Sequence, residues 1–231
     1  MRAILLAAGM GTRLRPLTLT TPKSLVKVNG QPILERQIEF LKEKGINEII
    51  IVTGYLKEKF DYLKEKYNIK LIYNDRYDKY NNIYSMYLVK EYLSDSYVID
   101  ADVYLHRNFL DKSIKISTYF SGYKTGFTNE WKLQYDDDNR VNNVKVEDGE
   151  GFIISGVSYW SKSDAKKIVE ELDKVVKNNS FKDLYWDDIV KSNIDDINVY
   201  IRKINEDDSF EIDSLEDLRF VEKILQEKLL Y

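Results

Sequence analysis

The chain contains no cysteine and one histidine, His106, among its 231 residues. The lack of cysteine excludes disulfide bonds, thiolate metal sites and cysteine nucleophiles. A single histidine cannot build a histidine-rich zinc site, and a Ser-His-Asp triad would depend on that one residue. We expect His106 to be a loop residue that follows a strand, so catalysis would rest on carboxylates, lysine, arginine and backbone groups.

Long apolar runs and an excess of positive charge are also missing. No segment reaches the ~18 apolar residues that cross a bilayer, and the apolar run at residues 3–8 is short even for a signal peptide. We therefore expect a buried strand there, no membrane insertion and a cytoplasmic protein. The net charge of −4 argues against a nucleic-acid partner, which requires a basic surface.

Strand-like and helix-like segments alternate over the first hundred residues. Strands are predicted at 3–8, 48–52, 70–73 and 96–99, and helices at 32–44, 57–66 and 83–93, the last with an N-cap at Asn82. This alternation is typical of an α/β fold with a right-handed, mostly parallel sheet flanked by helices. Such sheets bind ligands at the carboxyl ends of their strands, where polar clusters follow at 9–15, 53–55 and 100–102.

The second half of the chain has a different pattern. Short strands are predicted at 114–123, 126–135, 141–146 and 152–159, with turns at 136–139 and 147–151. Helices are predicted at 161–177, 184–192 and 214–229, a strand at 197–204 and a short strand or loop at 210–213. We expect an antiparallel elaboration over roughly 114–160, with some strands extending the main sheet, in one domain spanning 1–231.

The first polar cluster has the composition of a phosphate-binding loop. Gly9 and Gly11 let the backbone approach phosphate oxygens and present N–H groups to them. Arg13 can form forked, charge-assisted bonds to phosphate, and Lys23 adds a mobile charge. The two glycines alone could equally be explained by a tight turn after a strand. The loop lacks the third glycine of a dinucleotide fingerprint and the Gly-Lys-Ser/Thr of a P-loop.

Two pairs of carboxylates share one spacing. Asp100 and Asp102 end a predicted strand two residues apart, so they face the same side of an extended chain, and Glu211 and Asp213 repeat the arrangement. Mg²⁺ coordinates carboxylate and phosphate oxygens. The pairs indicate a metal site with one carboxylate from each, although surface acids, or an N-cap at Asp213, would show the same pattern.

These motifs together resemble a family. The run from Leu5 to Thr18, followed by Thr21-Pro22-Lys23-Ser24-Leu25, is similar to the signature of the nucleotidyltransferases that make nucleoside-diphosphate sugars and related activated head groups. Within that superfamily the chain most resembles the bacterial CTP:phosphocholine cytidylyltransferases. The supporting stretches are 74–77, 80–85, 97–102, 128–131 and 183–187. The resemblance implies a Rossmann-like fold, Mg²⁺, CTP and phosphocholine as substrates, and CDP-choline and pyrophosphate as products.

The resemblance also assigns roles to individual residues. Asp102 and Asp213 would hold Mg²⁺ with Glu211 as a third participant, while Arg13 and Lys23 would act on the phosphates. The nucleotide site would comprise Leu6, Ala8, Gly9, Gly11, Thr12, Thr53, Gly54, Asn81, Asn82 and Ser85. The amides of Asn81 and Asn82 can donate to and accept from a pyrimidine edge. A helix-capping role for Asn82 is an equally good interpretation.

For the acceptor we expect an aromatic box of Trp131, Tyr185 and Asp183. A quaternary ammonium has a diffuse charge that ring faces bind at cation–π distance, and a nearby carboxylate adds attraction. Trp160 and Trp186 are better explained as core residues.

The implied mechanism is a direct in-line attack of the acceptor phosphate on the α-phosphate of CTP. The alternatives are another acceptor (a sugar 1-phosphate, phosphoethanolamine or an aminoalkylphosphonate) or a non-catalytic nucleotide-binding regulatory subunit. The four charged residues Arg13, Lys23, Asp102 and Asp213 argue against the latter. The sequence carries no signal for the oligomeric state.

Overall fold

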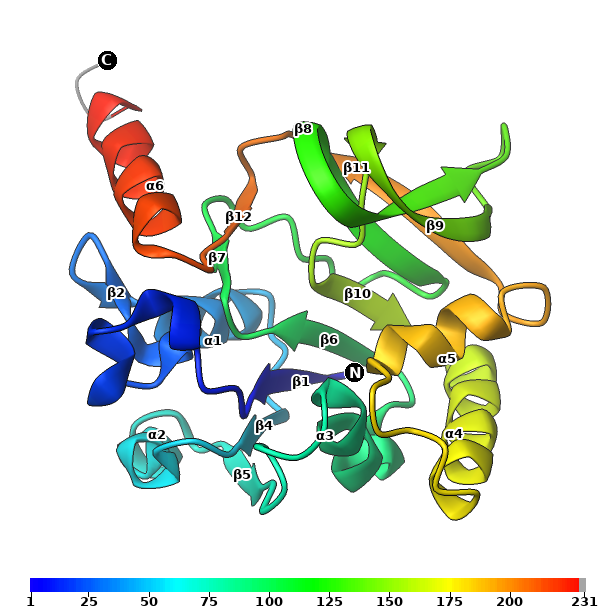
Figure 1. Cartoon of the computed structure of the whole chain (residues 1–231), viewed down its shortest axis with the longest axis horizontal. Coiled ribbons are helices and arrows are strands. Elements are labelled where there is room, and N and C mark those ends of the chain that lie inside the picture. Colours follow the sequence, from blue (N-terminus) through cyan, green and yellow to red (C-terminus); the bar gives the residue numbers. More distant parts are fainter. Residues whose placement is uncertain (229–231) are drawn as a thin grey trace.

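The computed structural model describes residues 1–228, which are organised around a mixed eight-stranded sheet (Figure 1). Its parallel half contains β1 (Arg2–Ala7), β4 (Ile49–Thr53), β5 (Lys70–Tyr73) and β6 (Ser96–Asp100). The other half contains β8 (Ser117–Tyr135), β9 (Val141–Phe152), β10 (Val157–Trp160) and β11 (Val199–Ile204). The order is β11-β8-β10-β6-β1-β4-β5, with β9 paired to β8, and β10 joins the halves by antiparallel pairing to β6.

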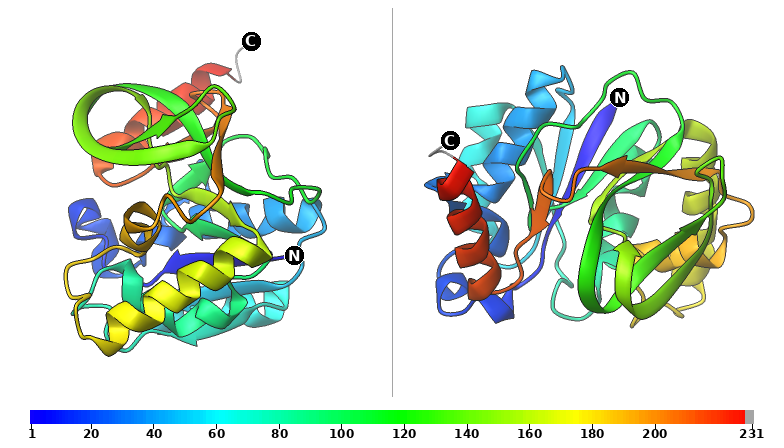
Figure 2. Two further views of the ribbon diagram at one scale, coloured as in Figure 1. Left: turned by 90° about the vertical axis from the view of Figure 1, so that its right-hand side faces the viewer. Right: turned by 90° about the horizontal axis from the view of Figure 1, so that it is seen from above.

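The central strand β1 is buried on both faces, as its apolar sequence predicts. Its side chains alternate: Ile4 and Leu6 enter one hydrophobic cluster, whereas Ala3 and Leu5 enter the cluster on the opposite face. The first cluster is covered by α3 (Asn82–Val89), α4 (Lys162–Lys177) and α5 (Trp186–Ser192), and the second by α1 (Ile33–Glu43) and α2 (Tyr62–Tyr67). Helices thus flank the sheet on both sides, confirming the predicted α/β fold (Figure 2).

A third, smaller cluster lies beneath α6 (Leu215–Lys228), across the molecule from α4 and α5 (Figure 1). Two short antiparallel two-stranded sheets accompany it: β2 (Lys27–Val28) with β3 (Gln31–Pro32), and β7 (Val103–Leu105) with β12 (Ser209–Glu211). Short 3-10 turns occur at η1 (Thr12–Leu14), η2 (Leu17–Leu19), η3 (Lys23–Leu25), η4 (Lys57–Phe60) and η5 (Lys90–Tyr92). Residue 229, the predicted end of the last helix, lies outside the described residues.

The second half corrects several predicted boundaries. The two strands expected at 114–123 and 126–135 are one 19-residue strand, β8. Gly126 and Asn129 adopt positive φ, and the register with β9 shifts on either side of Phe127, so these residues form bulges inside a continuous strand. The turn expected at 147–151 likewise lies within β9.

Three other local predictions were partly wrong. The helix expected at 57–66 is a 3-10 turn followed by the six-residue α2. The strand expected at 152–159 starts only at Val157. Asn82 is the first residue of α3, and its side chain bonds to another element instead of capping the helix. Trp160 and Trp186 are buried core residues as expected, packed edge to face with ring centroids 5.6 Å apart.

Among residues 1–228, no helix combines the length and the apolar character needed to span a membrane.

The connection from β6 to β7 is held in place by α1. Gln37 is completely buried, and its Nε2 donates hydrogen bonds to the carbonyl oxygens of Asp100 at 3.0 Å and Val103 at 2.7 Å. On the other side of this connection, the N–H of Ile212 donates to the carbonyl of Asp102 at 3.1 Å. These bonds fix the backbone on both sides of Asp102.

We expect Gln37→Leu to lower the free energy of unfolding by about 2–4 kcal/mol, because two buried carbonyls lose their donor. Urea denaturation measures this change. The control is Glu43→Leu, at an exposed position of the same helix, which should shift stability by less than about 0.5 kcal/mol. Equal stability of the two variants would contradict the role given to Gln37.

Candidate active site

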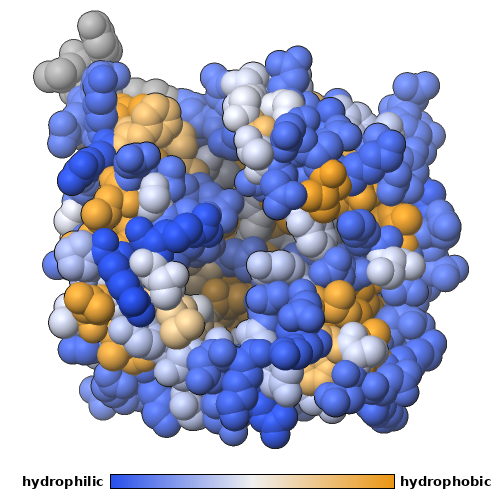
Figure 3. Space-filling model, in the orientation of Figure 1, coloured by the Kyte–Doolittle hydropathy of each residue, from blue (hydrophilic) through white to orange (hydrophobic). Residues whose placement is uncertain are grey.

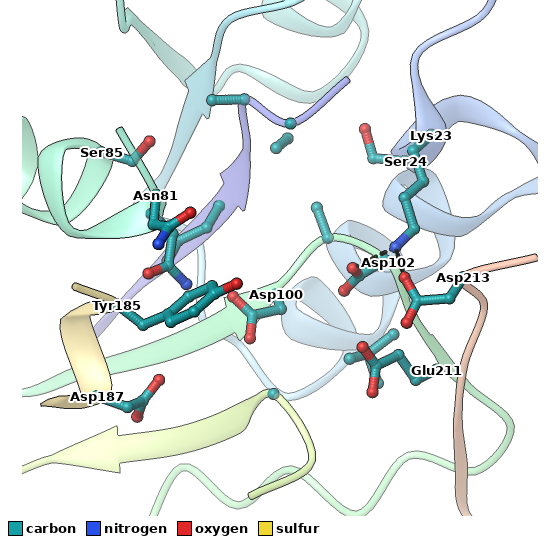
Figure 4. Close-up of a pocket in the computed structure, with 18 of the residues that line it drawn as sticks. Lys23, Ser24, Asn81, Ser85, Asp100, Asp102, Tyr185, Asp187, Glu211 and Asp213 are labelled. Atoms are coloured by element: carbon teal, nitrogen blue, oxygen red, sulfur yellow. Dashed lines mark hydrogen bonds and ion pairs between the residues drawn. The ribbon is translucent and has the colours of Figure 1, made fainter. Parts of the chain in front are cut away.

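A cavity of about 680 Å³ opens at the carboxyl ends of β1 and β6. The molecule is hollowed near the middle of this face, and hydrophilic residues surround the hollow (Figure 3). In Figure 4, Lys23, Asp102, Glu211 and Asp213 lie at one side of the cavity, and Asn81, Tyr185 and Asp187 lie at the other. The two sides have different chemistry.

Lys23 is the centre of the first side. Its Nζ lies 2.6 Å from Oδ2 of Asp102 and also pairs with Oδ1 of Asp213. The same Asp213 oxygen accepts a 2.8 Å contact from Nη2 of Arg13. The Lys23 side chain is 14% exposed and that of Arg13 is 72% exposed, so the lysine is enclosed by protein and the arginine lies at the solvent-facing edge of the cluster.

Glu211 completes a cluster of three carboxylates with Asp102 and Asp213. One oxygen from each lies within 4.8 Å of the others. Burial raises the pKa of Glu211 to about 8, and the charges of Asp102 and Asp213 add to the rise. Burial also acts to raise the pKa of Asp213, but the hydrogen bond and charge of Lys23, with Arg13, hold it below its usual value.

This donor set fits a divalent cation. It offers three hard carboxylate oxygens within 4.8 Å of one another, one each from Asp102, Glu211 and Asp213. Mg²⁺ uses few protein carboxylates and takes its remaining ligands from phosphate and water. The three predicted metal residues are therefore brought together by segments far apart in the sequence.

The glycine-rich loop lies against Lys23. Gly9 and Arg13 line the cavity, whereas Gly11 and Thr12 do not belong to its lining. Gly11 has φ 58°, and a Cβ on it would lie 2.7 Å from Cβ of Lys23. A glycine is thus required where the loop crosses the first carbons of the Lys23 side chain.

The predicted nucleotide-binding residues divide into lining and supporting groups. Leu6, Ala8, Asn81, Asn82 and Ser85 line the cavity. Thr53 and Gly54 stand behind this wall: a Cβ on Gly54 would lie 2.6 Å from the carbonyl oxygen of Ala8. Gly54 therefore permits the close approach that sets the position of Ala8.

Trp131 and Tyr185 meet at the second side of the cavity, which both residues line. Their ring centroids are 6.1 Å apart and their planes lie at 82°. Trp131 comes from β8 and Tyr185 from the residue before α5, so the long second-half strand supplies one wall. The prediction that these two residues form one subsite is consistent with this placement.

Asp183 lies outside the cavity lining, contrary to its predicted place in the box. It sits in an exposed turn whose backbone carbonyl accepts from Nδ2 of Asn81. Asp187 occupies the predicted position instead: it is 8% exposed, lines the cavity, and its Oδ1 accepts the Tyr119 hydroxyl at 2.9 Å. Burial raises the pKa of Asp187 to about 7.

Sequence reasoning also missed Glu130 and Asp100 as parts of the cavity lining. Both line the cavity, and burial raises the pKa of each, with neighbouring carboxylates adding to the rise. Asp187 and Glu130 lay within the stretches that carried the family resemblance, and Asp100 in the pair with Asp102. Asp187 could have been predicted from helix geometry. It lies in the first turn of α5, directly after Tyr185, and this turn lines the cavity.

Comparison with known proteins identifies the family of this chain. The profile of the nucleotidyl transferase family matches residues 2–118. The choline-phosphate cytidylyltransferase of Streptococcus pneumoniae (strain ATCC BAA-255 / R6) is 55% identical over 98% of this chain and 99% of its own. The 2-aminoethylphosphonate cytidylyltransferase of Lancefieldella rimae is 34% identical over 94% of this chain and 89% of its own.

A solved structure extends the comparison to three dimensions. The structure of CTP:phosphocholine cytidylyltransferase from Streptococcus pneumoniae superimposes with a TM-score of 0.95 and 56% identity, covering 97% of this chain and 98% of that one. The chain therefore belongs to the nucleotidyltransferase family and is an enzyme of that family, with bacterial choline-phosphate cytidylyltransferases among its near relatives.

Proposed function

We propose that the enzyme transfers the cytidylyl group of CTP to phosphocholine, forming CDP-choline and pyrophosphate. The observation that carries this proposal is the two-sided cavity: cationic groups and a carboxylate cluster at one side, and two perpendicular aromatic rings with the buried Asp187 at the other. Phosphocholine has the same division, with a phosphate at one end and a quaternary ammonium at the other. The near relatives that act on choline phosphate support the proposal.

The aromatic side suits a quaternary ammonium. Such a cation has no N–H to donate, so it is bound by ring faces, an interaction worth about 2 kcal/mol or more when water is excluded. Trp131 and Tyr185 offer these faces, and Asp187 supplies negative charge nearby in place of Asp183.

A second candidate acceptor is an aminoalkylphosphonate. Its primary ammonium would donate hydrogen bonds, for which Asp187, Glu130 and Asp100 are available acceptors. The relative from Lancefieldella rimae is named for this substrate class. The aromatic pair favours phosphocholine over an aminoalkylphosphonate, because ring faces bind the diffuse charge of a quaternary ammonium.

The chemical step requires no protein base. An oxygen of the acceptor phosphate attacks the α-phosphorus of CTP, and the bond from that phosphorus to the bridging oxygen breaks, so pyrophosphate leaves with the electron pair. The phosphate monoester, with a second pKa near 6, is already largely dianionic at neutral pH. Catalysis then consists of positioning and charge neutralisation.

We assign these tasks to residues at the cationic side. Lys23, held between Asp102 and Asp213, would neutralise charge around the α-phosphate, and the exposed Arg13 would hold the β- and γ-phosphates. Asp102 and Asp213, with Glu211, would hold Mg²⁺, which when bound supplies further charge neutralisation to phosphate oxygens. Gly9, Leu6, Ala8 and Ser85 would line the nucleoside pocket.

Lys23→Ala should lower kcat by about 100-fold or more, because a fixed cation at the reacting phosphate stabilises developing charge. Steady-state kinetics with CTP and phosphocholine measures the change, and thermal unfolding shows that the variant is folded. Lys27→Ala, at an exposed position, is the control. A normal kcat for Lys23→Ala would refute the role.

Asp102→Ala should remove the Mg²⁺ dependence of CTP binding, because the carboxylate cluster loses a member that faces the other two. Calorimetric titration of CTP with and without Mg²⁺ measures this dependence. Asp138→Ala, in the exposed turn between β8 and β9, should keep it. An unchanged metal dependence in Asp102→Ala would remove the assignment.

Trp131→Ala should raise KM for phosphocholine by about tenfold or more and leave KM for CTP nearly unchanged, because only the ammonium contacts the indole. Trp131→Phe keeps a ring face and should show a smaller rise. If KM for phosphocholine stayed the same in the alanine variant, the aromatic subsite would be wrong.

A further inference from the structure

Two asparagines that line the cavity are bonded to the segment that carries Tyr185. Nδ2 of Asn81 donates to the carbonyl oxygen of Asp183 at 2.9 Å. Oδ1 of Asn82 accepts from the backbone N–H of Trp186, also at 2.9 Å. The partners lie two residues before and one residue after Tyr185, so the pair brackets this residue. Figure 4 shows Asn81 and Tyr185 on the same side of the cavity.

The chemistry of the partners decides which atom of each asparagine is used. A backbone carbonyl only accepts hydrogen bonds, so Asn81 must present its amide nitrogen to Asp183. A backbone N–H only donates, so Asn82 must present its carbonyl oxygen to Trp186. The two neighbouring amides therefore act through opposite atoms.

Tyr185 is held by these two anchors together with its own backbone bonds to Asp188, whose Oδ2 accepts from the Tyr185 N–H at 2.9 Å and whose N–H donates to the Tyr185 carbonyl at 3.1 Å. Residues 180–185 contain no helix or strand, and α5 begins only at Trp186. The first N–H groups of a helix lack intrahelical acceptors, and Asn82 supplies one to Trp186. The Tyr185 side chain is 48% exposed, and its ring contact within residues 1–228 is with Trp131. Its orientation is thus set through its backbone.

We propose that Asn81 and Asn82 are positioning residues for the acceptor, which hold Tyr185 in place, and do not select the cytosine base. This inference rests on the proposed function, because it assumes that Tyr185 contacts the acceptor. It reassigns two residues that the sequence placed in the nucleotide site. It also links the start of α3 to the segment before α5 through two hydrogen bonds.

The opposite atoms allow a matched test with one substitution type. Asn82→Asp keeps an oxygen for the Trp186 N–H, whereas Asn81→Asp replaces the donor with an oxygen that faces the Asp183 carbonyl. Both variants add the same charge at adjacent positions, so the comparison removes the effect of charge. Asn82→Ala, which deletes the acceptor, completes the set.

The experiment is a measurement of KM for CTP and for phosphocholine with the full-length enzyme. Asn81→Asp and Asn82→Ala should raise KM for phosphocholine about tenfold, the effect of losing one hydrogen bond. Asn82→Asp should stay within about threefold of the wild type, and KM for CTP should change less than about threefold in all variants.

The outcomes separate this inference from the proposed function. A wild-type enzyme that does not turn over phosphocholine with CTP would refute the proposed function, and the inference that rests on it. With an active wild type, a rise in KM for CTP at unchanged KM for phosphocholine would overturn the inference and restore base reading. Equal phosphocholine KM values for Asn81→Asp and Asn82→Asp would also overturn it.

Discussion

The ion pairs of Lys23 with Asp102 and Asp213 are the interaction on which the rest of the site depends. They join residues 79 and 190 positions away in the chain. The lysine comes from the loop after β1, Asp102 from the connection after β6, and Asp213 from the residues after β12. Without this cation, the carboxylates around Asp102 would repel one another in a partly buried setting.

The same cluster explains why the site suits a nucleotide with a metal. Burial and the charges of Asp102 and Asp213 raise the pKa of Glu211, so a cation bound among the three carboxylates would favour its ionised form. A triphosphate adds more negative charge, which Arg13 and a divalent cation would balance. The mixed sheet then decides what faces this centre: its parallel half ends at the phosphate loop, and β8 in its other half carries Trp131 to the far wall.

Sequence reasoning predicted the parts whose position follows from one strand or one loop. The glycine loop, the carboxylates after β6 and the parallel strands of the first half follow from local patterns, because parallel strands bring their carboxyl ends to one edge. The full length of β8 was not predicted because of its bulges. Gly and Asn, the residues found at positive φ at positions 126 and 129, are also typical of turns. The sequence analysis placed Asp183, and not Asp187, in the acceptor subsite, because the sequence does not show which of the two acids faces the cavity.

The asparagines illustrate a further limit of local patterns. Asn82 precedes a helix, and both interpretations of the sequence, capping and base reading, used only neighbours in the chain. In the structure, the side-chain oxygen of Asn82 accepts a hydrogen bond from the backbone N–H of Trp186, 104 residues away. Long-range hydrogen bonds of this kind arise from tertiary packing, which no local spacing records.

The most direct test of the account is pyrophosphate release with Mg²⁺ over a grid of four nucleoside triphosphates against phosphocholine, phosphoethanolamine, 2-aminoethylphosphonate and a sugar 1-phosphate. The account predicts turnover concentrated on CTP with phosphocholine, because only that acceptor has a phosphate at one end and a quaternary ammonium at the other. Preferred turnover of a primary-amine or sugar acceptor would contradict the role of the aromatic rings. The absence of turnover with every pair would contradict the proposed chemistry itself.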